Sequence, residues 1–260
     1  MFKNQRHAQL LDILKEQGFA EVRELSLRLF ASQPTIRRDL DFLEKQGFVH
    51  RSHGGAILAN GSVNTPISFR RGTRTQEKLR ICRLAATLLS ADSLIFTDGS
   101  TTVSYLAEQI KEGDGITVVT NGYSICRTLA ENSVRTFSTG GRLLRDSLAF
   151  VGQRAEETVR QFNADLFFFS CAALSEDGMI SDYSEEETSL RQAMRQKSKR
   201  AVFLCDSAKI GKQTAFFAFS LSEIDYLVTD APLPPALLER IPMTLFSEQD
   251  HAYLYRNTTL

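Results

Sequence analysis

Two turns in the C-terminal part of the chain carry side chains that suit the binding of a phosphate. One turn follows an apolar run at residues 93–97 and consists of Asp98, Gly99, Ser100, Thr101 and Thr102. The other follows residues 201–205 and runs from Asp206 to Lys209. Hydroxyl groups, backbone N–H groups at the start of a helix and a lysine ammonium all hold phosphate oxygens. The two turns therefore indicate an anion site.

Two further turns have similar chemistry. Their members are Thr120, Asn121 and Gly122 in one, and Thr139, Gly140 and Gly141 in the other. Each turn alone is weak evidence, because strand-to-helix connections commonly use these residue types for their geometry. Several such turns at one edge of a sheet would together form a polar site for an anion.

Basic side chains in the N-terminal part suit DNA instead. Apolar residues at helical spacing predict a helix that begins at Ser32, whose hydroxyl is suited to cap it. Thr35, Arg37 and Arg38 lie in the first two turns of this helix, away from its apolar side. The N-terminal residues of a recognition helix contact base edges in the major groove. This helix is therefore a candidate recognition helix.

The segment after this helix predicts a small β-hairpin. Strands are expected near residues 48–51 and 56–58, with a turn at Gly54 and Gly55. Two helical patterns come before Ser32, so the predicted order is three helices and then a hairpin, which is a winged helix-turn-helix. Arg51 and His53 would lie on the wing, facing the DNA backbone or the minor groove. Three amphipathic helices also occur in bundles without any DNA function. The order of the elements and the distribution of charge therefore distinguish the two interpretations.

The charges favour the DNA interpretation. Residues 1–83 hold 15 basic and 8 acidic residues, a net charge of +7, whereas residues 84–260 carry −7. A basic part joined to an acidic body indicates an anionic partner at the basic end, nucleic acid first. Residues 59–83 alone supply +5 of this charge. Arg70 and Arg71 are left open as further phosphate contacts, and the residues from Lys78 onward are expected to form a solvated helix face.

The remaining sequence predicts an α/β domain with a mainly parallel sheet. Strands are expected at residues 93–97, 116–120, 135–138, 166–170, 201–205 and 226–229. Helical patterns lie between most of them, at residues 103–110, 124–131, 155–162 and 187–197. Ligands of such sheets bind beyond the carboxyl ends of the strands, where the polar turns described above are found.

Several classes of protein are disfavoured. The sequence has no stretch near the ~20 apolar residues of a membrane span, and its start lacks the pattern of a secretory signal. The four cysteines are far apart and form no CxxC pair, which fits a reducing cytoplasm and argues against a zinc site. We expect a cytoplasmic protein with neither a metal nor a cofactor.

Both parts of the chain resemble one family. Residues 32–40 read Ser-Gln-Pro-Thr-Ile-Arg-Arg-Asp-Leu and residues 51–56 read Arg-Ser-His-Gly-Gly-Ala. They are similar to the N-terminal signature of the DeoR family of bacterial transcription regulators. The resemblance implies the following set of DNA-contacting residues: Ser32, Gln33, Thr35, Ile36, Arg37, Arg38, Arg51 and His53.

The polar turns of the C-terminal part resemble the sensor domain of the same family. This implies a sugar-phosphate-isomerase-like fold and a phosphorylated sugar as effector. By that resemblance the phosphate would be held by Ser100, Thr101, Thr102 and Lys209, while Asp98, Asn121 and Asp206 would contact the sugar or order the loops. The expected site is completed by Gly99, Thr120, Gly140 and Gly141.

An isomerase is the alternative function. Such an enzyme needs a positioned base, and Asp98, Asp206 and Glu187 are carboxylates that offer one. Carboxylates at helix starts are more commonly caps, and a fold alone does not establish catalysis. We therefore expect a regulator, most simply a repressor of a sugar-utilisation operon that binds operator DNA and is released by a phosphosugar. Whether it represses or activates stays open.

The expected domain organisation has three parts. Residues 1–58 form the winged helix-turn-helix, residues 59–74 a linker, and residues 75–260 the effector-sensing and oligomerisation domain. The linker is inferred from its small, polar, Gly- and Pro-containing sequence. A homo-oligomer, either a dimer or a tetramer, is expected because two-fold oligomers match repeated half-sites on DNA.

Overall fold

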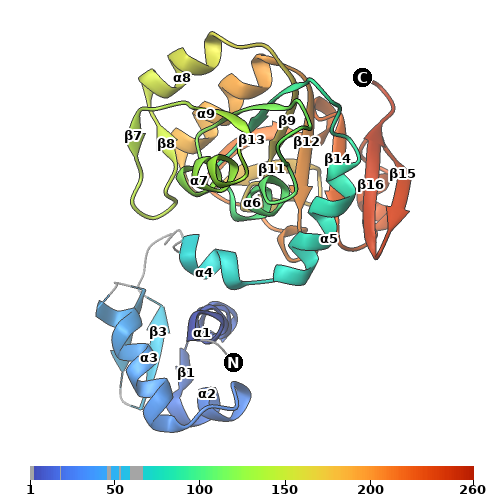
Figure 1. Cartoon of the computed structure of the whole chain (residues 1–260). Helices are drawn as coiled ribbons and strands as arrows, with labels where there is room; N and C mark the ends of the chain where they lie inside the picture. The colour runs from blue at the N-terminus through green and yellow to red at the C-terminus, as the bar shows by residue number, and fades with distance from the viewer. Residues whose placement is uncertain (1–2, 18, 46–47, 53, 59–66) are drawn as a thin grey trace. The chain divides into compact units, whose positions relative to one another are not determined.

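The structure, a computed structural model, describes residues 3–17, 19–45, 48–52, 54–58 and 67–260. The chain divides into two compact units, residues 1–73 and residues 74–260 (Figure 1). Each unit has a hydrophobic core of its own. No helix within the described ranges is long and apolar enough to span a bilayer.

The first unit is a winged helix-turn-helix, as the sequence predicted. Its elements are α1 (Lys3–Gln17), β1 (Phe19–Glu21), α2 (Val22–Arg28), α3 (Gln33–Lys45), β2 (Val49–Ser52), β3 (Gly55–Leu58) and α4 (Ile67–Gly72). The three strands form an antiparallel sheet in the order β1-β3-β2. The short strand β1 was not predicted, because three residues are too few for a periodic pattern.

Close packing explains two sequence features of this unit. A Cβ atom on Gly55 would lie 2.3 Å from the carbonyl oxygen of Ala20, so only glycine lets β3 approach β1. Leu10 and Leu14 of α1 are fully buried against Ile36 and Leu40 of α3 in one apolar cluster. Helix α4, which lies inside the stretch predicted as a linker, contacts α1. The rest of that stretch, residues 59–66, is outside the described residues.

The second unit is built on an eight-stranded sheet in the order β15-β16-β14-β12-β9-β4-β5-β6. The six strands from β14 to β6 are parallel, and the β15–β16 hairpin adds two antiparallel strands at one edge. The strands are β4 (Leu94–Thr97), β5 (Thr117–Thr120), β6 (Arg135–Ser138), β9 (Ala164–Phe169), β12 (Ser198–Cys205), β14 (Tyr226–Thr229), β15 (Met243–Gln249) and β16 (Ala252–Asn257). The predicted α/β fold class is confirmed.

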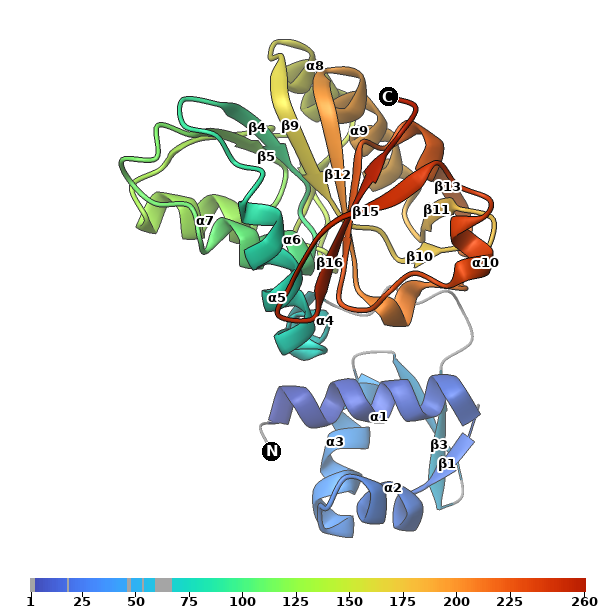
Figure 2. The same cartoon turned by 90° about the vertical axis from the view of Figure 1, so that its right-hand side faces the viewer.

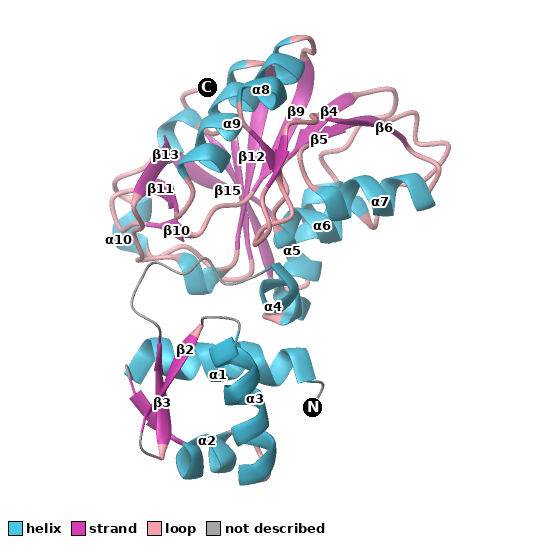
Figure 3. Cartoon of the chain, turned by 90° about the vertical axis from the view of Figure 1, so that its left-hand side faces the viewer, coloured by secondary structure: helices cyan, strands magenta, loops and turns pink. Residues whose placement is uncertain are grey.

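Helices cover both faces of this sheet (Figures 2 and 3). Alternating side chains of the central strands point to opposite cores, as Phe167 and Phe168 show. One face is covered by α5 (Thr75–Ala86), α6 (Thr101–Ala107) and α7 (Tyr123–Glu131), and the other by α8 (Gln153–Arg160) and α9 (Glu185–Gln196).

Smaller elements complete the second unit. Three strands form a second sheet in the order β10-β11-β13, and β7 pairs with β8. Their bounds, with those of the remaining short helices, are β7 (Arg142–Leu143), β8 (Phe150–Val151), β10 (Ala173–Leu174), β11 (Met179–Asp182), β13 (Phe216–Ser220), α10 (Pro235–Leu238) and the 3-10 helices η1 (Ser207–Lys209) and η2 (Leu221–Glu223). These elements and the β15–β16 hairpin were not predicted.

The strand order changes direction at one point of the large sheet, between β4 and β9. From β4 the chain proceeds to β5 and β6 on one side, whereas β9, β12 and β14 follow on the other side. The chain therefore reverses its direction across the sheet between β4 and β9. In open α/β sheets, ligands bind beyond the carboxyl ends of the strands at such a switch point.

Candidate functional site

The start of α3 has the geometry of a capped recognition helix. The Ser32 hydroxyl accepts a hydrogen bond from the backbone N–H of Thr35 at 3.4 Å and lies 2.9 Å from the Thr35 hydroxyl. Gln33 is exposed at the first position of the helix. Arg37 and Arg38 are exposed on the next turn. These side chains are available to a partner, as a recognition helix requires.

Ile36 has a different position. Its exposed fraction is 0%, and it packs in the core of the first unit with Leu40 and Leu43. A side chain in this position holds α3 on the domain and does not reach DNA. We therefore leave Ile36 out of the proposed DNA contacts, although it belongs to the same sequence motif.

Arg51 of β2 interacts with α3. Its guanidinium forms an ion pair with Asp41, and its backbone N–H donates to a carboxylate oxygen of Glu44 at 2.7 Å. These contacts fasten the wing to the recognition helix and offset the charge of Asp41. Arg51 stays partly exposed. His53, the second residue predicted on the wing, lies outside the described residues.

A buried ion network orients the recognition helix. Asp39 of α3 is 2% exposed and pairs with Arg6 and His7, both from α1. The distance from His7 Nε2 to Asp39 Oδ1 is 2.8 Å, and the His7 ring stacks on Phe42 with 5.1 Å between ring centroids. Burial lowers the pKa of His7 despite the nearby carboxylate of Asp39. Within the Arg37-Arg38-Asp39 run, the two arginines are therefore exposed, and Asp39 makes a buried structural contact.

In the second unit, Asp98 lies at the switch point of the sheet. It follows β4, and its carboxylate accepts hydrogen bonds from the backbone N–H groups of Ser100 at 3.2 Å and of Ser170 at 3.3 Å. Ser170 follows β9, so Asp98 joins the loops on both sides of the reversal. Arg191 Nε donates to Asp98 Oδ2 at 2.7 Å. Asp98 thus links the loops after β4 and β9 to α9.

Arg191 is a buried cation that the sequence did not single out. It lies on α9, is 5% exposed, and its Nη1 is 3.0 Å from Asp182 Oδ2. Its Nη2 is 3.9 Å from Glu187 Oε1 on the same helix. Burial lowers the pKa of Arg191, but the charges around it, Asp182 foremost, hold the pKa well above the ordinary value. Glu187 and Asp98 are therefore engaged by a guanidinium, which does not favour either as a catalytic base.

The turn after β4 is divided between capping and a lysine contact. The Ser100 hydroxyl accepts from the backbone N–H of Val103 at 3.3 Å and caps α6. Lys78 Nζ donates to the Thr101 hydroxyl at 3.3 Å. Lys78 is only 4% exposed, so the expectation that it lies on a solvated face is wrong. It falls on the apolar stripe of α5, which turns it toward the sheet.

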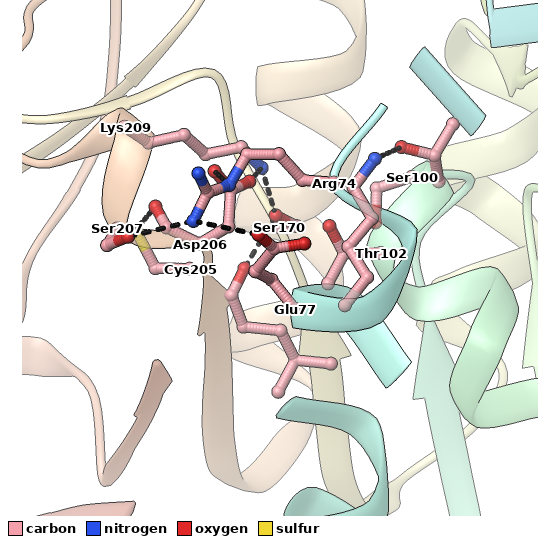
Figure 4. A network of polar contacts seen from close by, with 12 residues as sticks. Arg74, Glu77, Ser100, Thr102, Ser170, Cys205, Asp206, Ser207 and Lys209 are labelled. Atoms are coloured by element: carbon pink, nitrogen blue, oxygen red, sulfur yellow. Dashed lines mark hydrogen bonds and ion pairs between the residues drawn. The ribbon is translucent and has the colours of Figure 1, made fainter. Parts of the chain in front are cut away.

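Lys209 and Asp206 belong to the turn after β12. Lys209 Nζ donates to the Ser170 hydroxyl at 2.9 Å and lies 3.3 Å from Asp206 Oδ2 (Figure 4). Arg74 Nε is 3.2 Å from the other oxygen of Asp206. Burial raises the pKa of Asp206, but the charges of Lys209, Lys78 and Arg74 outweigh it, and the pKa lies below the ordinary value. Three cations therefore surround one carboxylate.

Buried polar atoms without a hydrogen-bond partner in the described structure lie at the same ends of the strands. They are Thr97 Oγ1 at the end of β4, Thr102 Oγ1 in the first turn of α6, Asn121 Oδ1 after β5 and Thr229 Oγ1 at the end of β14. All four residues are at most 3% exposed. In native structures such atoms usually pair with ordered water or with a bound ligand.

The predicted residues farther along the sheet have structural roles. The Thr120 hydroxyl accepts from the backbone N–H of Gly122 at 3.1 Å, and Asn121 Nδ2 donates to the carbonyl of Phe150 at 3.0 Å. A Cβ atom on Gly99 would lie 3.2 Å from the Gly122 Cα atom, so glycine allows the loops after β4 and β5 to meet closely.

The two glycines after β6 lie beside other elements. A Cβ atom on Gly141, whose φ is 102°, would lie 2.5 Å from the carbonyl oxygen of Val151 in β8. Gly140 has a φ of 62°. We attribute Gly141 to the close packing of β8 and Gly140 to its left-handed backbone, and we leave both out of the proposed phosphate contacts.

We call the residues that converge on the switch point the strand-end site. It contains Lys78, Asp98, Ser100, Thr101, Thr102, Ser170, Asp206 and Lys209. Sequence reasoning missed Lys78 and Ser170, and it missed the neighbours Arg74 and Arg191. Lys78 and Arg191 each carried a signal, because a charged residue at the apolar spacing of a helix must find a buried partner.

The arginines of α4 remain open. Arg71 is exposed and Arg70 is half-buried, and both have interactions within the described part of the chain. Whether either one also contacts DNA stays a prediction.

Comparison with known proteins assigns both units. A profile described as the DeoR-like helix-turn-helix domain matches residues 6–61, and one described as the DeoR C terminal sensor domain matches residues 73–231. Among solved structures, ribose 5-phosphate isomerase A from Methanocaldococcus jannaschii shares 9% identity, with 72% of this chain and 83% of that chain covered and a TM-score of 0.42. At a TM-score below 0.5 that likeness supports no argument about function.

Relatives match over nearly the whole chain. The glycerol-3-phosphate regulon repressor of Escherichia coli strain K12 is 30% identical over 240 residues, which covers 92% of this chain and 95% of that protein. The HTH-type transcriptional repressor GlcR of Bacillus subtilis strain 168 is 32% identical over 235 residues, with 88% and 89% covered. The HTH-type transcriptional repressor CsqR of Escherichia coli strain K12 is 30% identical over 237 residues, with 91% and 90% covered. With its winged helix and its sensor domain, the chain belongs to the DeoR family of transcriptional regulators.

Proposed function

We propose that the chain represses a sugar-utilisation operon, and that a phosphorylated sugar bound at the strand-end site releases it from its operator. The relatives named above are repressors, which supports a regulator and not an isomerase. The engagement of Asp98 and Glu187 by Arg191 also favours a regulator, because neither carboxylate is left available as a base.

The DNA contact is proposed for the exposed residues at the start of α3. Gln33, Arg37 and Arg38 are turned outward, while Asp39 and Ile36 hold the helix from its inner side. Arginine pairs with guanine in the major groove through two hydrogen bonds, which makes it suited to direct base contact. Ser32 and Thr35 form a hydrogen bond through their hydroxyls at the start of α3. We expect both to contact the DNA backbone there.

One observation supports the effector site most strongly. Lys209 and Lys78 bring positive charge to the hydroxyls of Ser170 and Thr101, and the hydroxyl of Thr102 in the same turn as Thr101 is buried without a hydrogen-bond partner in the described structure. A phosphate accepts hydrogen bonds from ammonium and hydroxyl groups, while sugar hydroxyls both donate and accept. A phosphorylated sugar is therefore a ligand class that would satisfy the charges and the open hydrogen-bonding atoms together.

The effector proposal is tested by ligand-induced stabilisation. The unfolding temperature of the full chain is measured with sn-glycerol 3-phosphate, glucose 6-phosphate and fructose 6-phosphate, and with the same compounds without phosphate. A ligand that binds only the folded state raises this temperature. We expect a phosphorylated compound to raise it in the wild type and in Lys212→Gln, an exposed control in the same loop, but not in Lys209→Gln. Equal responses of Lys209→Gln and the wild type would contradict the site.

Two further parts of the proposal concern assembly and location. We propose a homo-oligomer, a dimer or a tetramer, because winged-helix regulators read paired half-sites. Light scattering on the full chain at micromolar concentration tests this, and a monomer bound to a single site would contradict it. A cytoplasmic location follows from the proposed function, because the operator is part of the chromosome.

A further inference from the structure

Arg74 occupies a position between the two functions of the chain. It is the first residue of the second unit and is joined by a peptide bond to Thr73, the last residue of the first unit. The ion-pair and hydrogen-bond partners of its side chain in the described structure belong to the second unit. It reaches three residues at the carboxyl ends of β12 and β14: Asp206, Ser207 and Asp230.

The contacts of Arg74 join it to the loops after β12 and β14, and its Nη2 also lies 3.8 Å from Glu77 Oε1 in the first turn of α5. Nη2 lies 2.6 Å from Asp230 Oδ2. It also donates to the Ser207 hydroxyl at 2.9 Å, and Nε is 3.2 Å from Asp206 Oδ1 (Figure 4). Asp230 in turn accepts from the backbone N–H of Ser207 at 2.6 Å. One arginine therefore holds the loop after β12 and the loop after β14 together. We call Arg74, Asp206, Ser207 and Asp230 the Arg74 clamp.

The clamp shares a residue with the strand-end site. Asp206 pairs with Arg74 through Oδ1 and with Lys209 through Oδ2. A phosphate that binds Lys209 brings negative charge beside Asp206 and competes with it for both cations. This competition would affect Arg74 because Arg74 and Lys209 pair with the same carboxylate.

The backbone of Arg74 makes such competition consequential. Its φ is 51° and its ψ is 44°, which is the left-handed region, and it occupies the N-cap position of α5. A residue with a Cβ atom stays in this region only when its surroundings hold it there. The clamp contacts act here together with the hydrogen bond that the Arg74 carbonyl accepts from the backbone N–H of Lys78 at 3.1 Å, so loosening the clamp would weaken the hold on the backbone at the boundary with Thr73.

We propose that Arg74 is the positioning residue that couples the strand-end site to DNA binding. Without effector the clamp fixes the left-handed backbone at the unit boundary, and this is the operator-binding state. An effector phosphate at Lys209 draws Arg74 away from Asp206, the backbone leaves the left-handed region, and operator affinity falls. The effector part of this inference rests on the proposed function, whereas the clamp itself can be tested without any ligand.

The test compares two variants of the clamp, one that removes its positive charge and one that removes a negative charge. Arg74→Gln removes the cation and Asp230→Asn removes an acid that holds it. The probe is a duplex selected from random DNA by the wild-type full chain. Both variants should lower operator affinity at least about fivefold, the scale of an allosteric coupling. The control Arg80→Gln makes the same charge change within α5, where the Arg80 side chain donates to the carbonyl of Gln76 at 3.4 Å. It should keep wild-type affinity within about twofold.

The opposite charges separate coupling from direct DNA contact. If Arg74 acted on DNA by its charge, Asp230→Asn would release it and raise or preserve affinity. That result, or wild-type affinity of both variants, would overturn the proposal. Hydrogen exchange of the backbone amides in residues 74–80 adds a readout, because both variants should speed it and Arg80→Gln should not. Ser207→Ala replaces Asp230→Asn if the latter fails to fold, because it removes the hydroxyl that accepts from Arg74 and donates to Asp230.

Measurements with a phosphorylated compound then distinguish a failure of the clamp from a failure of the proposed effector site. With the phosphorylated compound that stabilises the wild type, Arg74→Lys should retain stabilisation but show a weaker effect of the compound on operator affinity. If no compound stabilises the wild type while both clamp variants weaken operator binding, the proposed effector fails and the clamp stands. If the compound stabilises and releases Arg74→Gln as it does the wild type, the clamp fails and the effector stands.

Discussion

The two units use buried charge in different ways. In the first unit one buried carboxylate, Asp39, is matched by two basic residues of α1, and this network serves only to orient α3. In the second unit three cations surround Asp206, and buried hydroxyls at the strand ends, such as that of Thr102, have no hydrogen-bond partner in the described structure. A satisfied network stabilises a fold, whereas an unsatisfied one at a switch point is suited to a ligand. In the proposed function, DNA binding therefore uses exposed residues and effector binding uses buried ones.

The largest effect is expected where a charge is buried among acids. Arg191→Met would leave Asp98 and Asp182 without their cation, and breaking a buried pair in this way costs about 3 to 5 kcal/mol. Urea unfolding of the full chain followed by circular dichroism measures the loss. Arg160→Met, which breaks an exposed ion pair with Glu156, should cost less than about 1 kcal/mol. A loss in Arg191→Met as small as in this control would show that the acids are not held as described.

The next effect concerns the exposed face of α3. Arg37→Ala and Arg38→Ala should each weaken operator binding by about 1 to 3 kcal/mol if they contact bases. The second unit should keep its unfolding midpoint, because both side chains lie outside the core. Fluorescence anisotropy with a labelled operator duplex gives the affinities. Lys45→Ala, a matched loss of charge in the last turn of the same helix, is the control, and equal effects of all three variants would indicate a general charge effect only.

A smaller effect separates paired from unpaired hydroxyls in the strand-end site. Thr102→Val removes a buried hydroxyl that has no partner in the described structure, so it should stabilise the second unit by about 1 kcal/mol. Thr101→Val removes the acceptor of Lys78 and should destabilise it by a similar amount. Both should weaken effector binding. Urea unfolding midpoints of the two variants decide the point, and destabilisation by Thr102→Val would mean that its hydroxyl is already satisfied.

The smallest effect is a pH dependence of the first unit. Because the pKa of His7 is lowered in the folded state, the unfolded chain binds more protons as the pH falls below the ordinary value of 6.5. Stability of the α1–α3 contact should therefore be full above this pH and decline on acidification. Native-state hydrogen exchange of α3 amides at pH 7.5 and 5.5 measures it. His7→Gln should flatten the dependence, while the exposed control His251→Asn should retain it.

The sequence predicted most of the fold because its elements have clear periods. The α/β alternation and the three helices with a hairpin all follow from apolar spacing and turn residues. The three-residue strand β1 and the two-residue strands β7 and β8 were missed because they are too short for a pattern. The β15–β16 hairpin was also not predicted, since it breaks the strand-and-helix alternation that identified the rest.

The candidate site was predicted only where its residues are local. Asp98 and Lys209 were found because they follow strands. Arg191 was missed because its partner Asp98 is 93 positions away in the sequence. Ile36 was included with its neighbours because a motif records both the residues that contact DNA and those that hold the helix. A charged residue at apolar helical spacing, as at Lys78, Asp39 and Arg191, was the unused signal.

The central claim is that ligand binding at the strand-end site releases operator DNA. Its most direct measurement is the anisotropy of a labelled operator duplex bound to the full chain, titrated with the phosphorylated compound that stabilises the wild type. We expect the compound to release the duplex from the wild type and from Lys212→Gln. We expect no release from Lys209→Gln, although that variant binds the operator as tightly as the wild type. Release from Lys209→Gln at the wild-type concentration of the compound would contradict the claim.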